Sequence, residues 1–353
     1  MLKIISIVGV RPQFVKLAPL SKALRHYFHE VIVHTGQHYN LNMSDSFFND
    51  LNIPAADFNL GVGSGGHGKQ TASMINGISD IIQKENPACV IVFGDTNSTL
   101  AGAIAASKMD VPLVHIESGL RSFNRKMPEE INRVVTDHVS DYLFAPTQTA
   151  MKNLEQEGLN SRSYLTGDIM VDAILGNLDK AKGKKNLLTQ NSIEKNMYYL
   201  LTLHRPYNVD NKESLEKIFN ELAMLDKPVV FPAHPRTKNI IDKYQMKIAD
   251  NIKVIDPVGY IDFLCLQFYS NKVITDSGGI QKEAYLLGKP CITLRSETEW
   301  LETVETGWNL LLKPETKNIA EEIKVFSPSS DRPNIFGMNV AEEMVQVIIG
   351  KAL

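Results

Sequence analysis

Short apolar runs rich in β-branched residues alternate along the chain with longer stretches in which apolar residues recur every three or four positions. The first pattern predicts buried strands and the second predicts amphipathic helices. Their alternation is typical of βαβ units and mostly parallel sheets. Two series of strands are expected: KIISIVG, EVIVHTG, ACVIVFGD, VPLVHIE and DYLFAPT, followed by MYYLLTLH, KPVVFPAH, IKVIDP, KVITD and PCITL.

The polar, lysine-rich stretch ILGNLDKAKGKKNLLTQNSIEKN separates the two series and lacks strong periodicity. Domain boundaries usually fall in such segments. We therefore expect an N-terminal Rossmann-like domain over residues 1–170, a linker over 171–196 and a C-terminal Rossmann-like domain over 197–335. A last helix is expected within 336–353, and the sequence allows it to pack on either domain.

Polar residues follow the expected strands directly, at Arg11, Gln37, Asp95, Glu117, His204, His234 and Ser277. In open α/β sheets this carboxyl edge is where ligands bind. Loops are polar in any protein, but HIESG, TLHR and PAHP place ionisable groups directly against apolar strands. The pattern predicts an α/β protein with two doubly wound domains that face a cleft.

The composition narrows the class of ligand. The chain has 353 residues, 43% hydrophobic residues and a formal net charge of −3, which fits a globular protein with a sizeable core. This charge gives no broad attraction to nucleic acid or to anionic membranes, so an anionic ligand needs a local site. Cys89, Cys265 and Cys291 lie far apart in apolar segments, which predicts buried free thiols in a cytoplasmic protein rather than disulfides or a metal site.

The glycine-rich stretch GVGSGGHGKQT over residues 61–71 fits two nucleotide-binding patterns, G-x-x-x-x-G-K and G-x-G-x-x-G. Both patterns require a buried strand before the glycines, and AADFNL makes a poor one. In the first pattern Ser or Thr follows the lysine and binds Mg²⁺, whereas Gln70 follows Lys69 here. We interpret the stretch as a loop that leads into the helix KQTASMINGISDIIQ and could cover the cleft.

A better anion site is expected in KVITDSGGIQKEAYLLGKP, where an apolar strand leads into Ser277, Gly278 and Gly279 before a helix. The glycines allow close backbone approach, and a helix N-terminus offers free N–H groups. Ser277 could bind phosphate or simply cap the helix. Glu283, one turn further on, could accept hydrogen bonds from a ribose diol or be a solvated surface residue.

A second group of cations lies in VGVRPQFVKLAPL, at an expected turn from strand to helix. Arg11 and Lys16 could both face a diphosphate there, with arginine as the bidentate donor. For Lys16 the ordinary alternative is a surface lysine whose stem packs on apolar neighbours.

These motifs resemble the non-hydrolysing UDP-N-acetylglucosamine 2-epimerases. The resemblance is collinear, spans nearly the whole chain and rests on GVRPQFVKLAPL, HTGQH, GDTNSTLAGAIAA, HIESGLRSF, PEEINRVVTD, TLHR and TDSGGIQKEAYLLGKP. It implies a glycosyltransferase-B-type architecture and a homodimer. It also implies inversion of C2 in a UDP-2-acetamido sugar by deprotonation, loss of UDP and its return, with no cofactor or metal.

The resemblance also implies which residues form the site. Catalysis needs acid–base groups on both faces of C2 and charge stabilisation near the diphosphate. The positions that match catalytic residues of the family are Asp95, Glu117, Glu129 and His204. The positions that match UDP-binding residues are Arg11, Lys16, Phe263, Ser277, Gly278, Gly279 and Glu283.

Most of these residues could also have a purely structural role. Asp95 could cap a helix, and Glu129 could pair with Arg133 at the start of a helix. His204 could be a buried histidine, as Phe263 could be a core aromatic residue. Glu117 has no evident cap or ion-pair role in the sequence.

Three positions depart from the family pattern: Trp300 in TEW replaces an arginine, Asn40 in QHYN replaces a glutamine and Asn76 replaces an arginine. They predict that allosteric activation by UDP-N-acetylglucosamine is absent. RSFNRKMPEEINR, IDPVGY and TEW also resemble the branch that acts on UDP-2,3-diacetamido-2,3-dideoxyglucuronate in bacterial polysaccharide synthesis. Arg125 or Lys126 could meet the extra carboxylate of that sugar.

Other functions on this architecture stay open at this point. They are a hydrolysing 2-epimerase, a glycosyltransferase and a UDP-sugar sensor without turnover. An ATPase fits the sequence least well.

Overall fold

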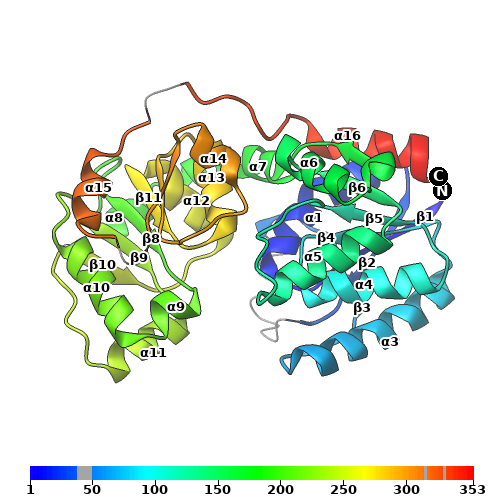
Figure 1. Cartoon of the computed structure of the whole chain (residues 1–353), viewed down its shortest axis with the longest axis horizontal. Coiled ribbons are helices and arrows are strands. Elements are labelled where there is room, and N and C mark those ends of the chain that lie inside the picture. Colours follow the sequence, from blue (N-terminus) through cyan, green and yellow to red (C-terminus); the bar gives the residue numbers. More distant parts are fainter. Residues whose placement is uncertain (38–49, 314–315, 329–330) are drawn as a thin grey trace. The chain divides into compact units, whose positions relative to one another are not determined.

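The computed structural model describes residues 1–37, 50–313, 316–328 and 331–353 (Figure 1). The chain forms two compact units, one of residues 1–176 and 334–353 and the other of residues 177–333. Helix α7 (Met170–Gly183) leads from the first unit into the second, and α8 (Asn186–Gln190) follows it. Residues 171–196, which the sequence indicates as a linker, therefore contain helical segments.

In its described residues the first unit has a seven-stranded parallel sheet with the order β3-β2-β1-β4-β5-β6-β7. Its strands are β1 (Lys3–Val8), β2 (His29–His34), β3 (Phe58–Asn59), β4 (Cys89–Phe93), β5 (Leu113–Ile116), β6 (Tyr142–Ala145) and β7 (Ser163–Leu165). Its further helices are α1 (Arg11–Leu24), α3 (His67–Glu85), α4 (Asn97–Lys108), α5 (Pro128–Val139), α6 (Gln148–Gln156), η1 (Asn160–Arg162), α16 (Val340–Val347) and η2 (Ile348–Ala352).

The second unit has a six-stranded parallel sheet in its described part, with the order β10-β9-β8-β11-β12-β13. Its strands are β8 (Tyr199–Thr202), β9 (Val229–Pro232), β10 (Ile252–Ile255), β11 (Lys272–Thr275), β12 (Cys291–Thr293) and β13 (Asn309–Leu311). Its further helices are α9 (Pro206–Val209), α10 (Lys212–Ala223), α11 (Pro235–Lys243), α12 (Tyr260–Tyr269), α13 (Gly278–Leu286), α14 (Leu301–Glu305) and α15 (Ile319–Val325).

The strand order reverses direction once in each sheet, between β1 and β4 in the first unit and between β8 and β11 in the second. This is the doubly wound α/β architecture that the alternation of strands and helices predicts. At such a reversal the loops that follow the two central strands diverge to opposite faces and leave a crevice for a ligand. The topology therefore places one candidate site at the carboxyl ends of β1 and β4, and a separate one at those of β8 and β11.

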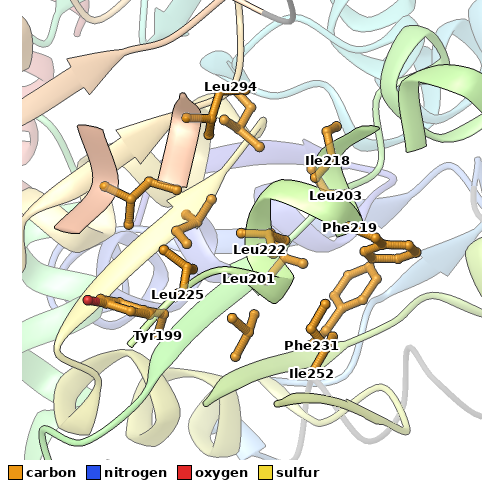
Figure 2. Close-up of a cluster of buried hydrophobic side chains, with 14 of the residues drawn as sticks. Tyr199, Leu201, Leu203, Ile218, Phe219, Leu222, Leu225, Phe231, Ile252 and Leu294 are labelled. Carbon is orange, nitrogen blue, oxygen red and sulfur yellow. The ribbon is translucent and has the colours of Figure 1, made fainter. Parts of the chain in front are cut away.

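The core of the second unit shows how sequence periodicity becomes packing (Figure 2). Leu215, Ile218, Phe219 and Leu222 follow a helical spacing, so they share one face of α10, and all four are buried. The rings of Phe219 and Phe231 of β9 meet edge to face at a centroid distance of 6.3 Å. This packing holds α10 against the sheet.

The glycine-rich stretch follows β3, a strand of two residues at the edge of the sheet. The expectation that AADFNL does not form a central strand is confirmed. Helix α3 follows as predicted and begins at His67. The Gln70 side chain lies buried and donates to the carbonyl of Gly63 at 2.7 Å. Neither nucleotide-binding pattern is present in its required setting.

The last helix, α16, packs on α1 of the first unit. Its start is fixed by Asp172, whose carboxylate accepts a hydrogen bond of 2.7 Å from the backbone N–H of Ala341. The chain also approaches itself closely at Gly167 and Gly337, where an added Cβ on either residue would lie 3.3 Å from the Cα of the other. The end of the chain thus belongs to the N-terminal unit.

Cys89, Cys265 and Cys291 are buried free thiols, as the sequence predicts. Burial raises the pKa of Cys89 and Cys291 to about 12, so both thiols stay protonated near neutral pH. None of the described helices combines the length and the apolar composition that crossing a bilayer requires.

Replacing Phe219 by alanine is expected to destabilise the protein by about 3–5 kcal/mol, because it removes a buried aromatic ring and leaves a cavity beside Phe231. Urea unfolding measures this loss. The exposed Asn220 on the same helix provides the control, Asn220→Ala, which we expect to unfold like the wild type. Equal midpoints for Phe219→Ala and the wild type would contradict this account of the core.

Candidate functional site

Three predicted site residues of the first unit lie at the carboxyl edge of its sheet, where the topology places a crevice. Arg11 begins α1 three residues after the last residue of β1, Asp95 lies two residues after β4, and Glu117 comes directly after β5. Arg11 is half-buried, and this desolvation lowers its pKa. The three side chains therefore come from adjacent strands of one sheet edge.

Lys16 and Glu117 form a buried ion pair, although 101 residues separate them in the sequence. Each side chain is 10% exposed. Gly94 packs against the pair, since a Cβ on it would lie 3.2 Å from both the Glu117 Oε2 and the Lys16 Nζ. The interpretation of Lys16 as a surface lysine is wrong, and Glu117 has an ion-pair partner that the sequence did not indicate.

The backbone of Glu117 is strained, with φ at 72° in the left-handed region that residues with side chains rarely adopt. The backbone N–H groups of Glu117 and Ser118 both donate to the carbonyl of Phe144, at 3.1 and 3.0 Å, and hold this conformation. Such strain costs on the order of 1–3 kcal/mol and is typical of functional sites. It directs the carboxylate of Glu117 toward Lys16.

Asp95 binds Arg133 of α5 at 3.0 Å and keeps about a third of its side chain exposed (35%). Its pKa is raised, chiefly by desolvation and further by the negative charges of Glu117 and Glu129. Arg133 and Lys16 oppose this shift. Asp95 is thus a carboxyl group that can hold a proton more readily than an ordinary aspartate.

Asp95 does not cap the helix that follows it. The N-cap of α4 is Thr96, whose hydroxyl accepts a hydrogen bond from the backbone N–H of Thr99 at 3.3 Å. The interpretation of Asp95 as an N-cap is therefore wrong by one residue. Because Thr96 takes the cap, the carboxylate of Asp95 is available for other contacts.

Helix α5 contributes Glu129 and Arg133, and Pro128 is its first residue. Arg133 is buried and binds the carboxylates of Asp95 and Glu130 at 3.0 and 2.9 Å. The sequence suggested Glu129 as its partner at this spacing, whereas these two ion pairs connect it to Asp95 and Glu130. Glu129 is partly exposed near Asp95.

The sequence reasoning did not select Gln13, which joins two turns at this edge of the first sheet. Its side-chain oxygen accepts from the backbone N–H groups of Gly9 and Val10, and its amide nitrogen donates to the carbonyl of Phe93 at 2.8 Å. Gln13 is 1% exposed. The RPQ motif contained it, but only the fold shows that the β1–α1 and β4–α4 turns are neighbours.

In the second unit, His204 lies after β8 and Asp276 after β11, on the two sides of the strand-order reversal. The His204 Nδ1 lies 2.9 Å from Asp276 Oδ1. Asp276 is fully buried and also accepts from the backbone N–H groups of His204 and Arg205. Burial raises its pKa, but the hydrogen bond and charge of His204 outweigh this and bring the pKa below its usual value.

The Asp276 carboxylate fixes the ring of His204. About half of the His204 side chain is exposed (52%). His204 is therefore not a buried core histidine. Asp276 was part of the TDSGG motif but was not selected as a site residue. Its position directly after a strand was the available signal.

Ser277 precedes helix α13, but its side chain makes no capping hydrogen bond, so the helix-cap interpretation of this hydroxyl is wrong. Gly278 lies tightly against Glu299, since a Cβ on it would lie 2.3 Å from the Glu299 Oε1. At Gly279 the nearest atom to such a Cβ is the Ser277 Oγ at 4.0 Å. The turn therefore combines a closely packed glycine with an open one at a helix N-terminus.

Glu283 is buried under α12 and is not a solvated surface residue. The Gln267 amide donates to its carboxylate. Desolvation raises the pKa of Glu283 to about 7, while Gln267 and Lys282 act in the opposite direction. Near neutral pH this carboxyl group is poised between its two forms.

Tyr260, Phe263 and Gln267 are spaced so that they share one face of α12. Phe263 is partly buried, and the hydroxyl of Tyr260 is buried without a hydrogen-bond partner in the described part of the chain. A buried polar group in this condition is uncommon and often marks a site that a ligand completes.

The positions that depart from the family pattern differ in their settings. Trp300 is buried, with the Lys282 Nζ 4.1 Å from the centroid of its ring, so it packs behind the Gly278 turn. Asn76 is exposed on α3, and Arg125 and Lys126 are exposed before α5. Asn40 lies outside the described residues. The described residues contain no group of His, Cys, Asp and Glu arranged to hold a metal ion.

Comparison with known proteins identifies relatives. Residues 22–350 match the family model described as UDP-N-acetylglucosamine 2-epimerase. A protein of Methanocaldococcus jannaschii with that name is 44% identical over 99% of each chain. The UDP-2,3-diacetamido-2,3-dideoxy-D-glucuronate 2-epimerase of Pseudomonas aeruginosa is 46% identical over 92% of each chain. The crystal structure of the M. jannaschii UDP-GlcNAc 2-epimerase in complex with UDP-GlcNAc and UDP has a TM-score of 0.90 over 99% of each chain.

The buried Glu283 predicts a pH-dependent contribution to stability. Its pKa in the folded protein is about 7 against an ordinary value of 4.5, so its contribution is complete below about pH 4.5 and is lost as the pH rises through 7. The shift corresponds to a loss of about 3 kcal/mol. Glu283→Gln removes the titrating group, and we expect it to unfold at higher urea than the wild type at about pH 8 and much like it at about pH 5.

The exposed Glu321 provides the matched control, since Glu321→Gln is expected to leave the pH dependence of unfolding unchanged. If the urea midpoints of Glu283→Gln and the wild type differ by the same amount at both pH values, Glu283 does not titrate as described.

Proposed function

Because the chain belongs to the UDP-N-acetylglucosamine 2-epimerase family, we propose that it interconverts UDP-N-acetylglucosamine and UDP-N-acetylmannosamine without net hydrolysis. A base removes the proton from C2, the C1–O bond to UDP breaks, and an alkene forms between C1 and C2. UDP then returns to C1 and a proton returns to the opposite face of C2. The observation that carries this proposal is the group of interacting carboxylates at the carboxyl edge of the first sheet.

The environments of Asp95 and Glu117 differ in a way that suits acid–base chemistry. Glu117 is paired with the ammonium group of Lys16, whereas the raised pKa of Asp95 favours its protonated form. Two nearby titratable groups in contrasting environments are typical of an acid and its base partner. We assign proton transfer to Asp95 and Glu117, and we assign Glu129 to the same acid–base group.

The second unit would hold the nucleotide. Ser277, Gly278 and Gly279 lie at the N-terminus of α13, where backbone N–H groups and the helix dipole favour a diphosphate. Glu283 would accept hydrogen bonds from the ribose diol, and Phe263 would pack on the uracil ring. Their placement around the reversal between β8 and β11 supports this assignment.

His204 would stabilise the departing diphosphate. The carboxylate of Asp276 at its Nδ1 holds the imidazole ring in place. A hydrogen-bond donor or cation near the developing negative charge lowers the barrier to C1–O cleavage. Arg11 and Lys16 are proposed as further cationic contacts to UDP.

A second candidate substrate is UDP-2,3-diacetamido-2,3-dideoxyglucuronate. The P. aeruginosa relative named for this sugar is as similar to the chain as the M. jannaschii relative. Arg125 and Lys126 are exposed shortly before Glu129, where a sugar carboxylate could meet them. Under either substrate we propose a homodimer that supplies sugars for polysaccharide synthesis in the cytoplasm.

Incubation with UDP-N-acetylglucosamine in deuterium oxide is expected to place deuterium at C2 and to produce UDP-N-acetylmannosamine, as followed by proton NMR. Asp95→Asn, Glu117→Gln and Glu129→Gln are each expected to slow this exchange by about 10²–10⁴-fold, because each removes a proton-transfer group. Asp57→Asn is the control, since Asp57 binds the backbone N–H of Ile32 away from this edge.

The products distinguish the alternatives. Release of free UDP and N-acetylmannosamine would identify a hydrolysing enzyme. Exchange only with the diacetamido-uronate sugar would assign that substrate, and binding of both sugars without exchange would indicate a sensor. An exchange rate that is unchanged in one of the three variants would remove that residue from proton transfer.

The rate is expected to rise hyperbolically with the concentration of UDP-N-acetylglucosamine, because the chain departs from the family pattern at Asn40 and Asn76. Initial-rate kinetics in both reaction directions test this. Sigmoidal rates, or a reverse reaction that requires added UDP-N-acetylglucosamine, would show that allosteric activation is present.

A further inference from the structure

His115, on strand β5, is a fully buried histidine with a hydrogen-bond acceptor at each ring nitrogen. Its Nδ1 lies 2.6 Å from Asp137 Oδ1 of helix α5, and its Nε2 lies 2.7 Å from the backbone carbonyl of Gly94. An ionised carboxylate and a carbonyl can only accept hydrogen bonds. The ring therefore makes both bonds only when both nitrogens carry protons, as an imidazolium.

The surroundings balance this buried charge. Asp137 Oδ2 accepts from the backbone N–H of Gly119 at 3.0 Å and from Arg121 at 2.7 Å. Arg121 also binds Glu157 through two hydrogen bonds of 2.7 Å. Desolvation raises the pKa of Asp137, but His115 and Arg121 outweigh this and bring it below its usual value. Two cations and two carboxylates thus form a paired cluster, which a buried site requires.

The cluster connects the chain segments that present the proposed acid–base residues. Gly94 immediately precedes Asp95, and Gly119 follows Glu117 by two residues. Asp137 lies one turn after Arg133 on α5, and Arg133 binds Asp95. The imidazolium therefore ties the β4–α4 turn, the β5 loop and helix α5 together directly behind the carboxylates.

We propose that His115, as an imidazolium, is a positioning residue for Asp95 and Glu117. This inference rests on the proposed acid–base role of those two residues. His115 is 0% exposed and acts on the reaction only through its hydrogen bonds. Losing them removes the donor to the Gly94 carbonyl or to Asp137 Oδ1 and lets the adjacent turns shift. A displacement of about 1 Å at a catalytic group lowers the rate by about 10²-fold.

The test combines two variants with one measurement on the wild type. His115→Gln and His115→Phe are expected to lower kcat for C2 exchange by about 10²-fold. Both are expected to change the Kd for UDP, measured by calorimetry, far less than kcat, because Ser277, Gly278, Gly279 and Glu283, which supply most of the proposed UDP contacts, lie in the second unit. In the wild type labelled with ¹⁵N-histidine, both ring nitrogens of His115 should show protonated chemical shifts in the buffer of the activity assay, because each has a hydrogen-bond acceptor.

Glu30→Gln is the matched control. Glu30 is buried in the same sheet and binds Ser6, Ser21 and Arg25, but it lies near the start of β2, away from the carboxyl edge. This variant is expected to lose stability and to retain kcat. A similar loss of kcat in Glu30→Gln would show that general destabilisation explains the effect.

Three further outcomes would overturn the inference: an unchanged kcat in folded His115→Gln, an equal loss of UDP affinity and kcat, or an unprotonated ring nitrogen in the wild type. If the variants fail to fold, the NMR measurement still decides the protonation of the ring. Failure of the wild type to exchange C2 with either sugar would instead contradict the proposed function, and the chemical shifts would still report on His115.

Discussion

The reversal of strand order at the centre of each parallel sheet is the constraint on which the rest of the structure depends. Parallel strands need crossover connections, so every loop at the carboxyl edge returns to a neighbouring strand. At the reversal two such loops turn apart and leave room for a ligand. Arg11, Asp95, His204 and Asp276 all follow strands at these two points. The candidate site of each unit is therefore a product of the same topological feature.

The charges at the edge of the first sheet are arranged in linked pairs. Lys16 binds Glu117, Arg133 binds Asp95, and His115 binds Asp137 behind them. Each pair brings together residues that are distant in the sequence, and each reduces the desolvation cost of burying a charge. The ion pairs do not fully offset desolvation and carboxylate repulsion at Asp95, so the pKa of Asp95 is raised. The network thus leaves Asp95 with a raised pKa, which suits the proton-transfer role proposed for this residue.

The second unit positions its polar groups through a helix N-terminus and buried hydrogen-bond partners rather than through linked ion pairs. Its turn before α13 presents backbone N–H groups at a helix N-terminus, and a closely packed Gly278 keeps Glu299 beside them. Asp276 holds the ring of His204, while Glu283 is buried with Gln267 as its donor. Rigid positioning of polar groups by buried partners lowers the cost of binding an anionic nucleotide. The family to which the chain belongs binds such nucleotides in known structures of other members.

The sequence by itself determined the α/β class, the two series of strands, the strand-to-helix turn at DSGG and the absence of a nucleotide-loop setting for the glycine-rich stretch. These depend on local periodicity and on residues next to one another in the chain. Only the tertiary structure decided that Lys16 pairs with Glu117, that Thr96 and not Asp95 caps α4, and that Glu283 is buried. Ion pairs and burial arise when strands that are distant in the sequence become neighbours, so no local sequence pattern predicts them.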